Sequence, residues 1–275
     1  MRIVLTGATG RAGHPAARHL SRMGHEVTTL GRRPSVLGLP HLDWQLGGPC
    51  PDLGFADALV HAAFDHVPGR YRGGEGDDAP GFIARNRDGT LRLFDAVRGR
   101  RIVFLSSRAV YGSPPPGTSL PETREPAPDT LYGKMKREVE IAVTDRGGVS
   151  LRATGLYGPP RPGKAHKWAD LFADFSAGRP IAPRVATELH VDDLATAVAL
   201  ALDLEQPQIL NVSDIVLDRC DLLGTWGAIH GIAGPLPRRA DASSVREMET
   251  TRLRALGWTP RGMAGLRDTL AGMRP

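Results

Sequence analysis

A glycine-rich turn stands directly behind an apolar run at the start of the chain. The run, Arg2–Leu5, is typical of a buried strand, and it is followed by Thr6-Gly7-Ala8-Thr9-Gly10-Arg11-Ala12-Gly13. A helical pattern over Gly10–Met23 comes next, and a second strand is expected at Glu26–Leu30. Glycines here permit a tight turn, close approach of backbone N–H groups to a pyrophosphate, and close packing of helix on strand. The turn therefore predicts a dinucleotide site, with an ordinary glycine turn as the alternative, and its residues are Gly7, Thr9, Gly10, Arg11, Ala12 and Gly13.

The first half of the chain alternates strand and helix patterns, which predicts an α/β fold with a Rossmann doubly wound parallel sheet. Further strands are expected at Ala58–His61, Arg101–Leu105 and Val149–Arg152, and helices at Gly81–Val97 and Tyr132–Val143.

The second half changes character. Helical patterns surround short strands near Glu188–His190 and Ile209–Val212, and these helices are expected at Trp168–Ala177, Val191–Leu204, Arg219–His230 and Ser244–Leu256. We therefore expect an NAD(P)-binding Rossmann domain over residues 1–155, with some later elements packing back onto it. Residues 156–275 are expected to form mainly a small C-terminal α/β substrate-binding cap.

Composition removes several classes of protein. With 275 residues, 41% of them hydrophobic, the chain can bury a large core. The two cysteines, Cys50 and Cys220, lack metal-ligand spacing, so we expect neither a disulfide scaffold nor a metal site. The apolar runs Ile3–Leu5 and Leu194–Leu202 are too short for a signal or a membrane span. A cytoplasmic protein with no membrane partner is expected.

The charge balance is basic, with a net charge of +5. The arginines are scattered and form no block interleaved with aromatic residues, so we expect no nucleic-acid partner and attribute part of the charge to an anionic cofactor. A small-molecule substrate is the expected partner, and a homodimer is left open.

The end of the second expected strand bears on the choice of cofactor. An NAD site uses an acidic residue here for the ribose 2′-hydroxyl, but this chain has Leu30-Gly31-Arg32-Arg33. Guanidinium groups suit a 2′-phosphate, so Arg32 and Arg33 favour NADP over NAD. A solvated basic loop is the alternative interpretation.

Tyr132 and Lys136 are four residues apart on an expected helix and so lie on one face. An ammonium near a phenol lowers the pKa of the phenol, which can then exchange a proton with a carbonyl or alcohol oxygen. The alternative is a chance pair on a helix surface. Upstream, an expected strand ends in Ser106 and Ser107, at the sheet edge where ligands bind in open α/β sheets.

Together these motifs resemble the extended short-chain dehydrogenase/reductase superfamily, in its NAD(P)-dependent epimerase/dehydratase family. The matching segments run in the family's order: Thr6–Gly13, Asp57–Ala63, Asn86 with Gly89, Ser106–Gly112, Tyr132–Lys136, Leu151–Pro159 and His190–Ala195.

The resemblance implies a role for several of these residues. Tyr132 would be the general acid/base, Lys136 would hold the nicotinamide ribose and tune Tyr132, and Ser107 would polarise the substrate. The remaining expected cofactor contacts are Ser106, Ala62, Ala63, Thr154 and Gly155.

Departures from the family pattern concern the substrate. Relatives that bind nucleotide-sugars usually carry an arginine before the His-Val-x-Asp motif, and the segment Pro183–His190 lacks it at the aligned place. Ala153 stands where a proline is usual, and the acidic residue that contacts adenine in the family is replaced near Gln45–Gly47. The resemblance therefore does not imply a nucleotide-sugar substrate for this chain.

The sequence thus predicts an NADP-dependent oxidoreductase or epimerase that acts on an alcohol or ketone of a small, sugar-like or carboxylated molecule. Besides Ser107, Arg70 and Arg72 are expected to contact the substrate from a loop over Gly69–Gly81 that closes on it, with a mobile surface loop as the alternative. The competing hypothesis is a non-catalytic dinucleotide sensor of the same fold. We interpret His190-Val191-Asp192-Asp193 as a helix cap and His61 as a core histidine.

Overall fold

Burial along the first strand already requires a sheet that is covered on both faces. In the computed structural model, which describes residues 1–67, 73–161 and 163–273, Ile3, Val4 and Leu5 are all fully buried. Because alternate residues of a strand point to opposite faces, Ile3 and Leu5 enter one hydrophobic cluster and Val4 another. Each such side chain stabilises the fold by about 1.5–3 kcal/mol.

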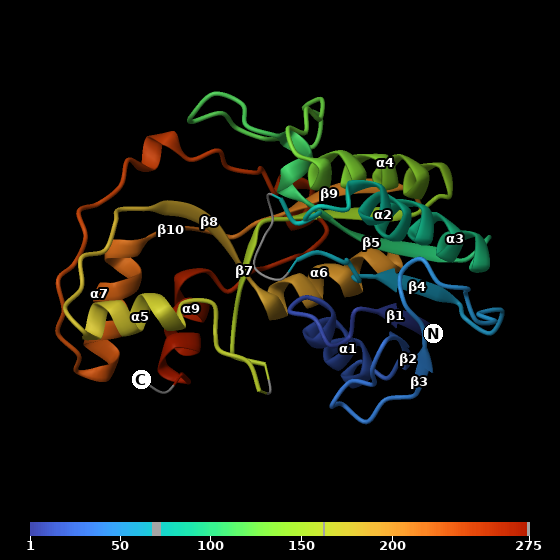
Figure 1. Cartoon of the computed structure of the whole chain (residues 1–275), viewed down its shortest axis with the longest axis horizontal. Coiled ribbons are helices and arrows are strands. Elements are labelled where there is room, and N and C mark those ends of the chain that lie inside the picture. Colours follow the sequence, from blue (N-terminus) through green and yellow to red (C-terminus); the bar gives the residue numbers. More distant parts are fainter. Residues whose placement is uncertain (68–72, 162, 274–275) are drawn as a thin grey trace.

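The large sheet has seven parallel strands in the order β3-β2-β1-β4-β5-β6-β9 (Figure 1). They are β1 (Arg2–Thr6), β2 (Glu26–Gly31), β3 (His41–Asp43), β4 (Ala58–His61), β5 (Arg101–Ser107), β6 (Val149–Ala153) and β9 (Gln208–Val212). The strand order reverses between β1 and β4, as in a doubly wound Rossmann sheet, which confirms the predicted fold class.

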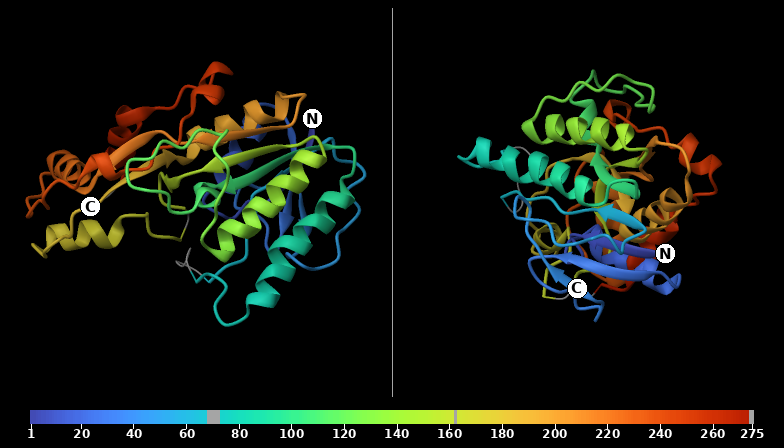
Figure 2. Two further views of the ribbon diagram at one scale, coloured as in Figure 1. Left: turned by 90° about the horizontal axis from the view of Figure 1, so that it is seen from above. Right: turned by 90° about the vertical axis from the view of Figure 1, so that its right-hand side faces the viewer.

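Helices cover both faces of this sheet (Figures 1 and 2). One face carries α1 (Gly13–Arg22) and α6 (Val191–Asp203), and the other carries α2 (Ala79–Ile83), η1 (Ala84–Asp88), α3 (Gly89–Ala96) and α4 (Leu131–Asp145). The helix expected over 81–97 is therefore divided by η1, a π-helical turn. Such turns are frequent at functional sites.

The η1 turn fixes the chain segment that follows β4. The Asn86 side chain, 3% exposed, donates from Nδ2 to the carbonyls of Asp65 and Phe82 at 2.8 and 3.0 Å and accepts from the Asp65 N–H at 2.7 Å. Arg85 Nε donates to the Asp65 carboxylate at 2.7 Å. The segment that leaves the sheet at β4 is thus held in place at Asp65.

A second, three-stranded sheet builds the other end of the molecule. Its order is β10-β8-β7, from β7 (Gly155–Tyr157), β8 (Val185–His190) and β10 (Ile215–Asp218). Around it lie α5 (Ala169–Ser176), α7 (Arg219–His230) and α9 (Gly262–Ala271), which bury an aromatic cluster that includes Tyr157, Phe172 and Trp226. Strand β9 and helix α6, although they come after this part begins, belong to the layers of the large sheet.

The prediction of one helix over residues 244–256 was wrong. Only η3 (Ala242–Ser244) and α8 (Thr251–Ala255) form, because the intervening backbone bonds elsewhere. Leu120 donates its N–H to the Glu247 carbonyl at 2.8 Å and accepts from the Glu249 N–H at 3.2 Å. Pairing with a distant segment has replaced the helical hydrogen bonds. Among the described residues, no helix has the length and apolarity to cross a membrane.

Candidate active site

The glycine turn between β1 and α1 is tightly packed against the end of β4. Gly7 adopts a φ of +75°, and a Cβ there would lie 2.8 Å from the backbone N of Ala63. Gly10 donates its N–H to the Gly7 carbonyl at 2.7 Å, and a Cβ on Gly13 would collide with that carbonyl. Side chains are thus excluded where backbone must approach a ligand. The cradle fits the diphosphate of a dinucleotide at the start of α1.

Buried threonines and a histidine tie this turn to β4. Thr6 Oγ1 accepts from the N–H groups of Ala62 and Ala63 at 3.1 and 3.0 Å. The His61 ring bridges Thr6 Oγ1 and Thr90 Oγ1 at 2.9 and 3.0 Å. Burial, together with the charge of Lys136, lowers the pKa of His61 to about 3. His61 is therefore a neutral core residue, and Ala62 and Ala63 are set beside the turn.

The predicted NADP residues lie at the end of β2. Arg32 and Arg33 are both exposed there, next to Gly31, which ends the strand. Arg11, another of the predicted cofactor-binding residues, lies near Lys167 and Glu188. Burial lowers the pKa of Lys167 and raises that of Glu188, and the charge of Arg11 acts on both groups. Thr9 accepts a hydrogen bond from Arg161 at its carbonyl.

Helix α4 presents Tyr132 and Lys136. Thr130 caps it by accepting from the Gly133 N–H at 3.1 Å. A Cβ on Gly133 would lie 2.5 Å from the Ala109 carbonyl oxygen, so glycine lets the helix closely approach the turn that follows β5. The Tyr132 ring meets Phe64 edge-on, with ring centroids 4.9 Å apart. Phe64 follows Ala63, so Tyr132 lies near the end of β4.

Lys136 is only 5% exposed. Its ammonium donates to the Leu105 carbonyl at 2.6 Å and lies 4.5 and 4.8 Å from the ring centroids of Phe104 and Phe64. Burial lowers its pKa to about 7, and the charge of Glu140 opposes that shift. Nζ lies 5.9 Å from the centroid of the Tyr132 ring, close enough for its charge to act on the phenol.

The two serines at the end of β5 have different surroundings. Ser107 Oγ accepts from the Ala109 N–H at 3.1 Å and caps η2 (Arg108–Tyr111). Ser106 Oγ donates to Glu140 at 2.5 Å, inside the protein. Glu140 also accepts two hydrogen bonds from Arg152, at 2.9 and 2.7 Å. The Ser106 hydroxyl thus donates its proton to a buried ion pair and has none left to donate to a cofactor.

Thr154 and Gly155 lie where the chain passes from the large sheet to the small one. Thr154 Oγ1 is 2.5 Å from Thr187 Oγ1. A Cβ on Gly155 would lie 3.0 Å from Glu188 Oε2 and 3.2 Å from Lys167 Nζ, which pair with each other. Sequence reasoning missed this pair, because its members are 21 residues apart on separate elements and nothing local connects them.

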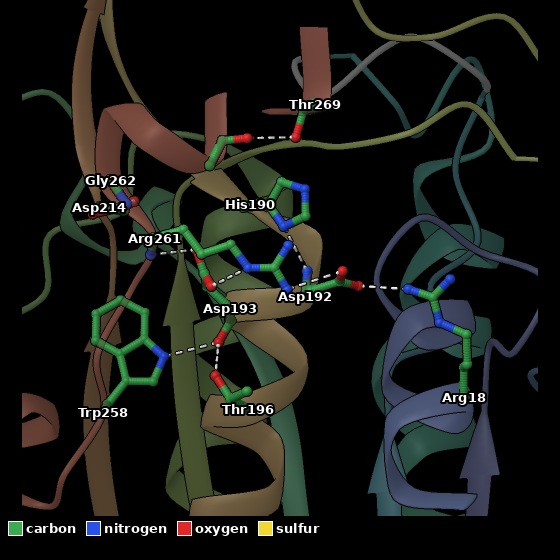
Figure 3. Close-up of polar contacts among 11 residues, drawn as sticks. Arg18, His190, Asp192, Asp193, Thr196, Asp214, Trp258, Arg261, Gly262 and Thr269 are labelled. Atoms are coloured by element: carbon green, nitrogen blue, oxygen red, sulfur yellow. Dashed lines mark hydrogen bonds and ion pairs between the residues drawn. The ribbon is translucent and has the colours of Figure 1, made fainter. Parts of the chain in front are cut away.

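The His190–Asp193 motif forms a structural network (Figure 3). His190 Nδ1 accepts from the Asp192 N–H at 3.1 Å and so caps α6. Asp192 pairs with Arg18 at 2.7 Å and with Arg261 at 3.1 Å. Burial raises the pKa of Asp193 to about 6, and Asp193 accepts from the Arg261 N–H at 3.1 Å. The network joins α1, α6 and the segment before α9.

Two expected substrate contacts, Arg70 and Arg72, lie outside the described residues, and so does the start of the expected closing loop. Among the described residues, no group of three or more histidine, cysteine, aspartate or glutamate side chains is arranged to hold a metal.

A parallel Rossmann sheet with a glycine cradle at its switch point defines a dinucleotide-binding protein of the short-chain dehydrogenase/reductase kind. The chain belongs to the NAD dependent epimerase/dehydratase family, whose model matches residues 3–213. This confirms the resemblance seen in the sequence. The chain is accordingly an enzyme of that family, and use of a nicotinamide dinucleotide goes with membership.

Relatives of known activity extend over nearly the whole chain. A 3-diazoavenalumate denitrifying reductase from a Streptomyces species is 28% identical, and the match covers 100% of this chain and 96% of the relative. A UDP-glucose 4-epimerase from Corynebacterium glutamicum is 26% identical over 94% and 91% of the two chains. Among solved structures, MoeE5 in complex with UDP-glucose and NAD has the same fold, with a TM-score of 0.80, 23% identity, and coverage of 98% and 96%.

Proposed function

We propose that this protein is an NADP-dependent oxidoreductase or epimerase that acts on an alcohol or ketone of a small substrate. The observation that carries the proposal is the position of Tyr132 and Lys136 on α4, beside Phe64 at the end of β4 and the Leu105 carbonyl of β5. Both strands end at the edge of the sheet where the glycine turn lies, and ligands of open α/β sheets bind at that edge.

In this proposal Tyr132 exchanges a proton with the substrate oxygen, while the nicotinamide, when bound, supplies or accepts the hydride. Lys136 lies buried near the phenol, and its protonated form lowers the pKa of Tyr132 from about 10 toward neutrality. The Ser107 hydroxyl polarises the substrate oxygen. The backbone of the glycine turn, with Ala62 and Ala63, holds the dinucleotide.

The preference for NADP rests on Arg32 and Arg33, which are exposed at the end of β2 and suit a 2′-phosphate. NADPH should bind at least several-fold more tightly than NADH, because a charge-assisted hydrogen bond contributes about 1.5–3 kcal/mol. Fluorescence titration of both cofactors checks this. Equal affinities, or an unchanged NADPH affinity in the Arg32→Ala/Arg33→Ala protein, would exclude the assignment.

Three substitutions test the chemistry. Tyr132→Phe keeps the ring and removes the proton, so turnover should fall by about 10²–10⁴-fold while NADPH affinity stays within a few-fold. Lys136→Met should lower both turnover and affinity, because it removes the ribose contact as well as the charge. Ser107→Ala should lower turnover alone.

The readout is NADPH absorbance during a screen of small carbonyl compounds, since a net reductase consumes NADPH and an epimerase recycles it. A fully active Tyr132→Phe enzyme would place the chemistry elsewhere. Cofactor binding without any turnover in the intact protein would favour a dinucleotide sensor.

A further inference from the structure

A cavity lies in the small-sheet end of the molecule, between α5, β8, β10 and α7. Its volume is about 380 Å³, within the range of small-molecule sites. Glu188 and Lys167, which line it, are also the groups that a Cβ on Gly155 would touch. Two side chains of the cavity thus lie against Gly155, an expected cofactor contact, and none of Tyr132, Lys136 and Ser107 lines it.

One side of this cavity is apolar. Its wall includes Leu217 and Leu222, which are 6% and 2% exposed, and the less buried Leu171 and Ile181. Trp168, 8% exposed, adds an aromatic ring. A wall of this kind favours a hydrocarbon or aromatic body over a sugar, whose hydroxyl groups would lose hydrogen bonds to water there.

The other side carries two guanidinium groups, Arg184 and Arg219. Arg219 Nη1 donates to the Ala182 carbonyl at 2.9 Å, which anchors this side chain at the cavity. Burial lowers the pKa of Arg219, and the nearby charge of Arg184 lowers it further, so the two cations repel each other. Repulsion of this kind is relieved when an anion binds between the charges.

The acidic groups of the cavity leave these arginines largely uncompensated. Glu188 pairs with Lys167, and Asp174 pairs with Arg179 at 2.6 Å. Asp170, in the first turn of α5, is the remaining acid of the lining. Within the described parts of the chain, no carboxylate lies within ion-pair distance of Arg184 or Arg219, whereas Arg179 and Arg239 of the same end each have one.

We propose that this cavity binds the anionic end of an organic-acid substrate, whose carboxylate or phosphate lies between Arg184 and Arg219 and whose apolar body packs on Leu171, Ile181 and Leu222. The inference rests on the proposed function, because it assigns a substrate class to that same enzyme. A guanidinium binds either anion through two parallel hydrogen bonds, so the chemistry recognised is a compact planar or tetrahedral oxyanion.

The experiment measures binding of simple probes to protein saturated with NADPH, so that the dinucleotide site cannot take up the anion. Phenylacetate and phenyl phosphate represent the two anions, phenylacetamide is the neutral match, and UDP represents a nucleoside diphosphate. Isothermal titration should show at least one of the two aryl anions binding at least tenfold more tightly than the amide. Whichever of the two binds more tightly identifies the anion.

The Arg184→Gln/Arg219→Gln protein should lose at least tenfold in affinity for that anion. Arg98→Gln, a change at an arginine whose side chain is 83% exposed on the opposite part of the molecule, should lose none. Unchanged NADPH affinity in the double variant shows that it is folded. Equal binding of amide and anion, no loss in the double variant, or tighter binding of UDP than of both aryl anions would overturn the inference.

Because the readout is binding, it is independent of hydride transfer. A failure of Tyr132→Phe to lower turnover would remove the proposed chemistry and leave the anion site standing. Conversely, turnover that depends on Tyr132 without any anion site would remove only the substrate class.

Discussion

At the scale of single residues, the candidate site contains ionisable side chains that are buried away from water. His61 and Lys136 are both buried near the end of β4 and β5, and burial lowers the pKa of each, to about 3 and about 7. For His61 the charge of Lys136 adds to the effect. The ring therefore stays neutral while it bridges Thr6 and Thr90.

His61 gives the fold a pH dependence. Its pKa is about 6.5 in the unfolded chain and about 3 in the folded one, so the unfolded state binds more protons between these values and stability falls as pH falls. Between pH 7 and pH 5 this amounts to about 2 kcal/mol. Urea unfolding at both pH values should show wild type losing about 2 kcal/mol more than His61→Gln. Equal losses would mean that His61 is protonated in the fold.

Gly13 is the residue of the glycine turn that leaves the least room for a side chain. A Cβ there would meet the Gly7 carbonyl and the Ala8 N, so Gly13→Ala must displace the turn. We expect a loss of about 1–3 kcal/mol in stability, as in overpacked cores, and a larger relative loss in dinucleotide affinity. Gly224→Ala, in α7, is the control, since a Cβ on Gly224 would meet nothing nearer than a flexible Leu236 side-chain atom 4.0 Å away. The control should be at least as stable as wild type, because alanine favours a helix.

At the scale of secondary-structure elements, one face of α4 carries both the residues proposed for the chemistry and the residue that anchors the helix. Tyr132, Lys136 and Glu140 follow at intervals of four residues on one face. Glu140 and Arg152 are 0% and 1% exposed in their side chains and bond to each other twice, so they fix α4 against β6. The position of Tyr132 and Lys136, the two groups proposed to act on the substrate, depends on this pair.

Removal of one partner of the Glu140–Arg152 pair should lower the free energy of unfolding. Arg152→Met removes the two-bond partner of the buried Glu140 carboxylate, which keeps only the Ser106 hydroxyl and, at 3.6 Å, Arg137. Loss of one partner of a buried pair costs about 3–5 kcal/mol. Replacing both residues, as in Glu140→Leu/Arg152→Met, should recover most of that loss. Thermal and urea unfolding of the two variants check the order. A double variant that is no more stable than Arg152→Met would contradict it.

At the scale of the whole molecule, carboxylates hold the two ends together. Asp193 on α6 accepts from the Arg261 N–H at 3.1 Å and its carbonyl accepts from Trp258 Nε1 at 2.8 Å. Asp214, between β9 and β10, accepts from the Gly262 N–H at 2.9 Å. The start of α9 is thus attached to the layers of the large sheet.

Removal of both carboxylates should loosen α9 selectively. In Asp193→Ala/Asp214→Ala, amide hydrogen exchange over residues 258–271 should accelerate at least tenfold while β1, β4 and β5 keep their protection. Asp221, on α7, forms an exposed ion pair with Arg239. The control Asp221→Ala breaks that pair and should leave the exchange of α9 unchanged. Uniform acceleration over the whole chain would indicate global destabilisation instead.

The features that sequence reasoning found are those with a local signature. The glycine turn, the Tyr132–Lys136 spacing and the end of β5 each occupy a few consecutive residues, so periodicity and turn chemistry reveal them. The pair Lys167–Glu188 and the cavity around Arg184 and Arg219 depend on where the chain returns in space. The expected helix over 244–256 failed for the same reason, since its backbone partner is Leu120.

The position of β9 at the edge of the large sheet also affects how the protein is made. Strand β6 ends at Ala153, and its last neighbour, β9, ends at Val212, after the chain has passed through β7, α5 and β8. At about 5–20 residues per second, the roughly 60 intervening residues take about 3–12 s to synthesise. During that time β6 is an open edge with unpaired backbone groups, which is a template for pairing with other chains. A ribosome-bound chain of this protein therefore passes through an aggregation-prone stage that ends only when residue 212 has emerged.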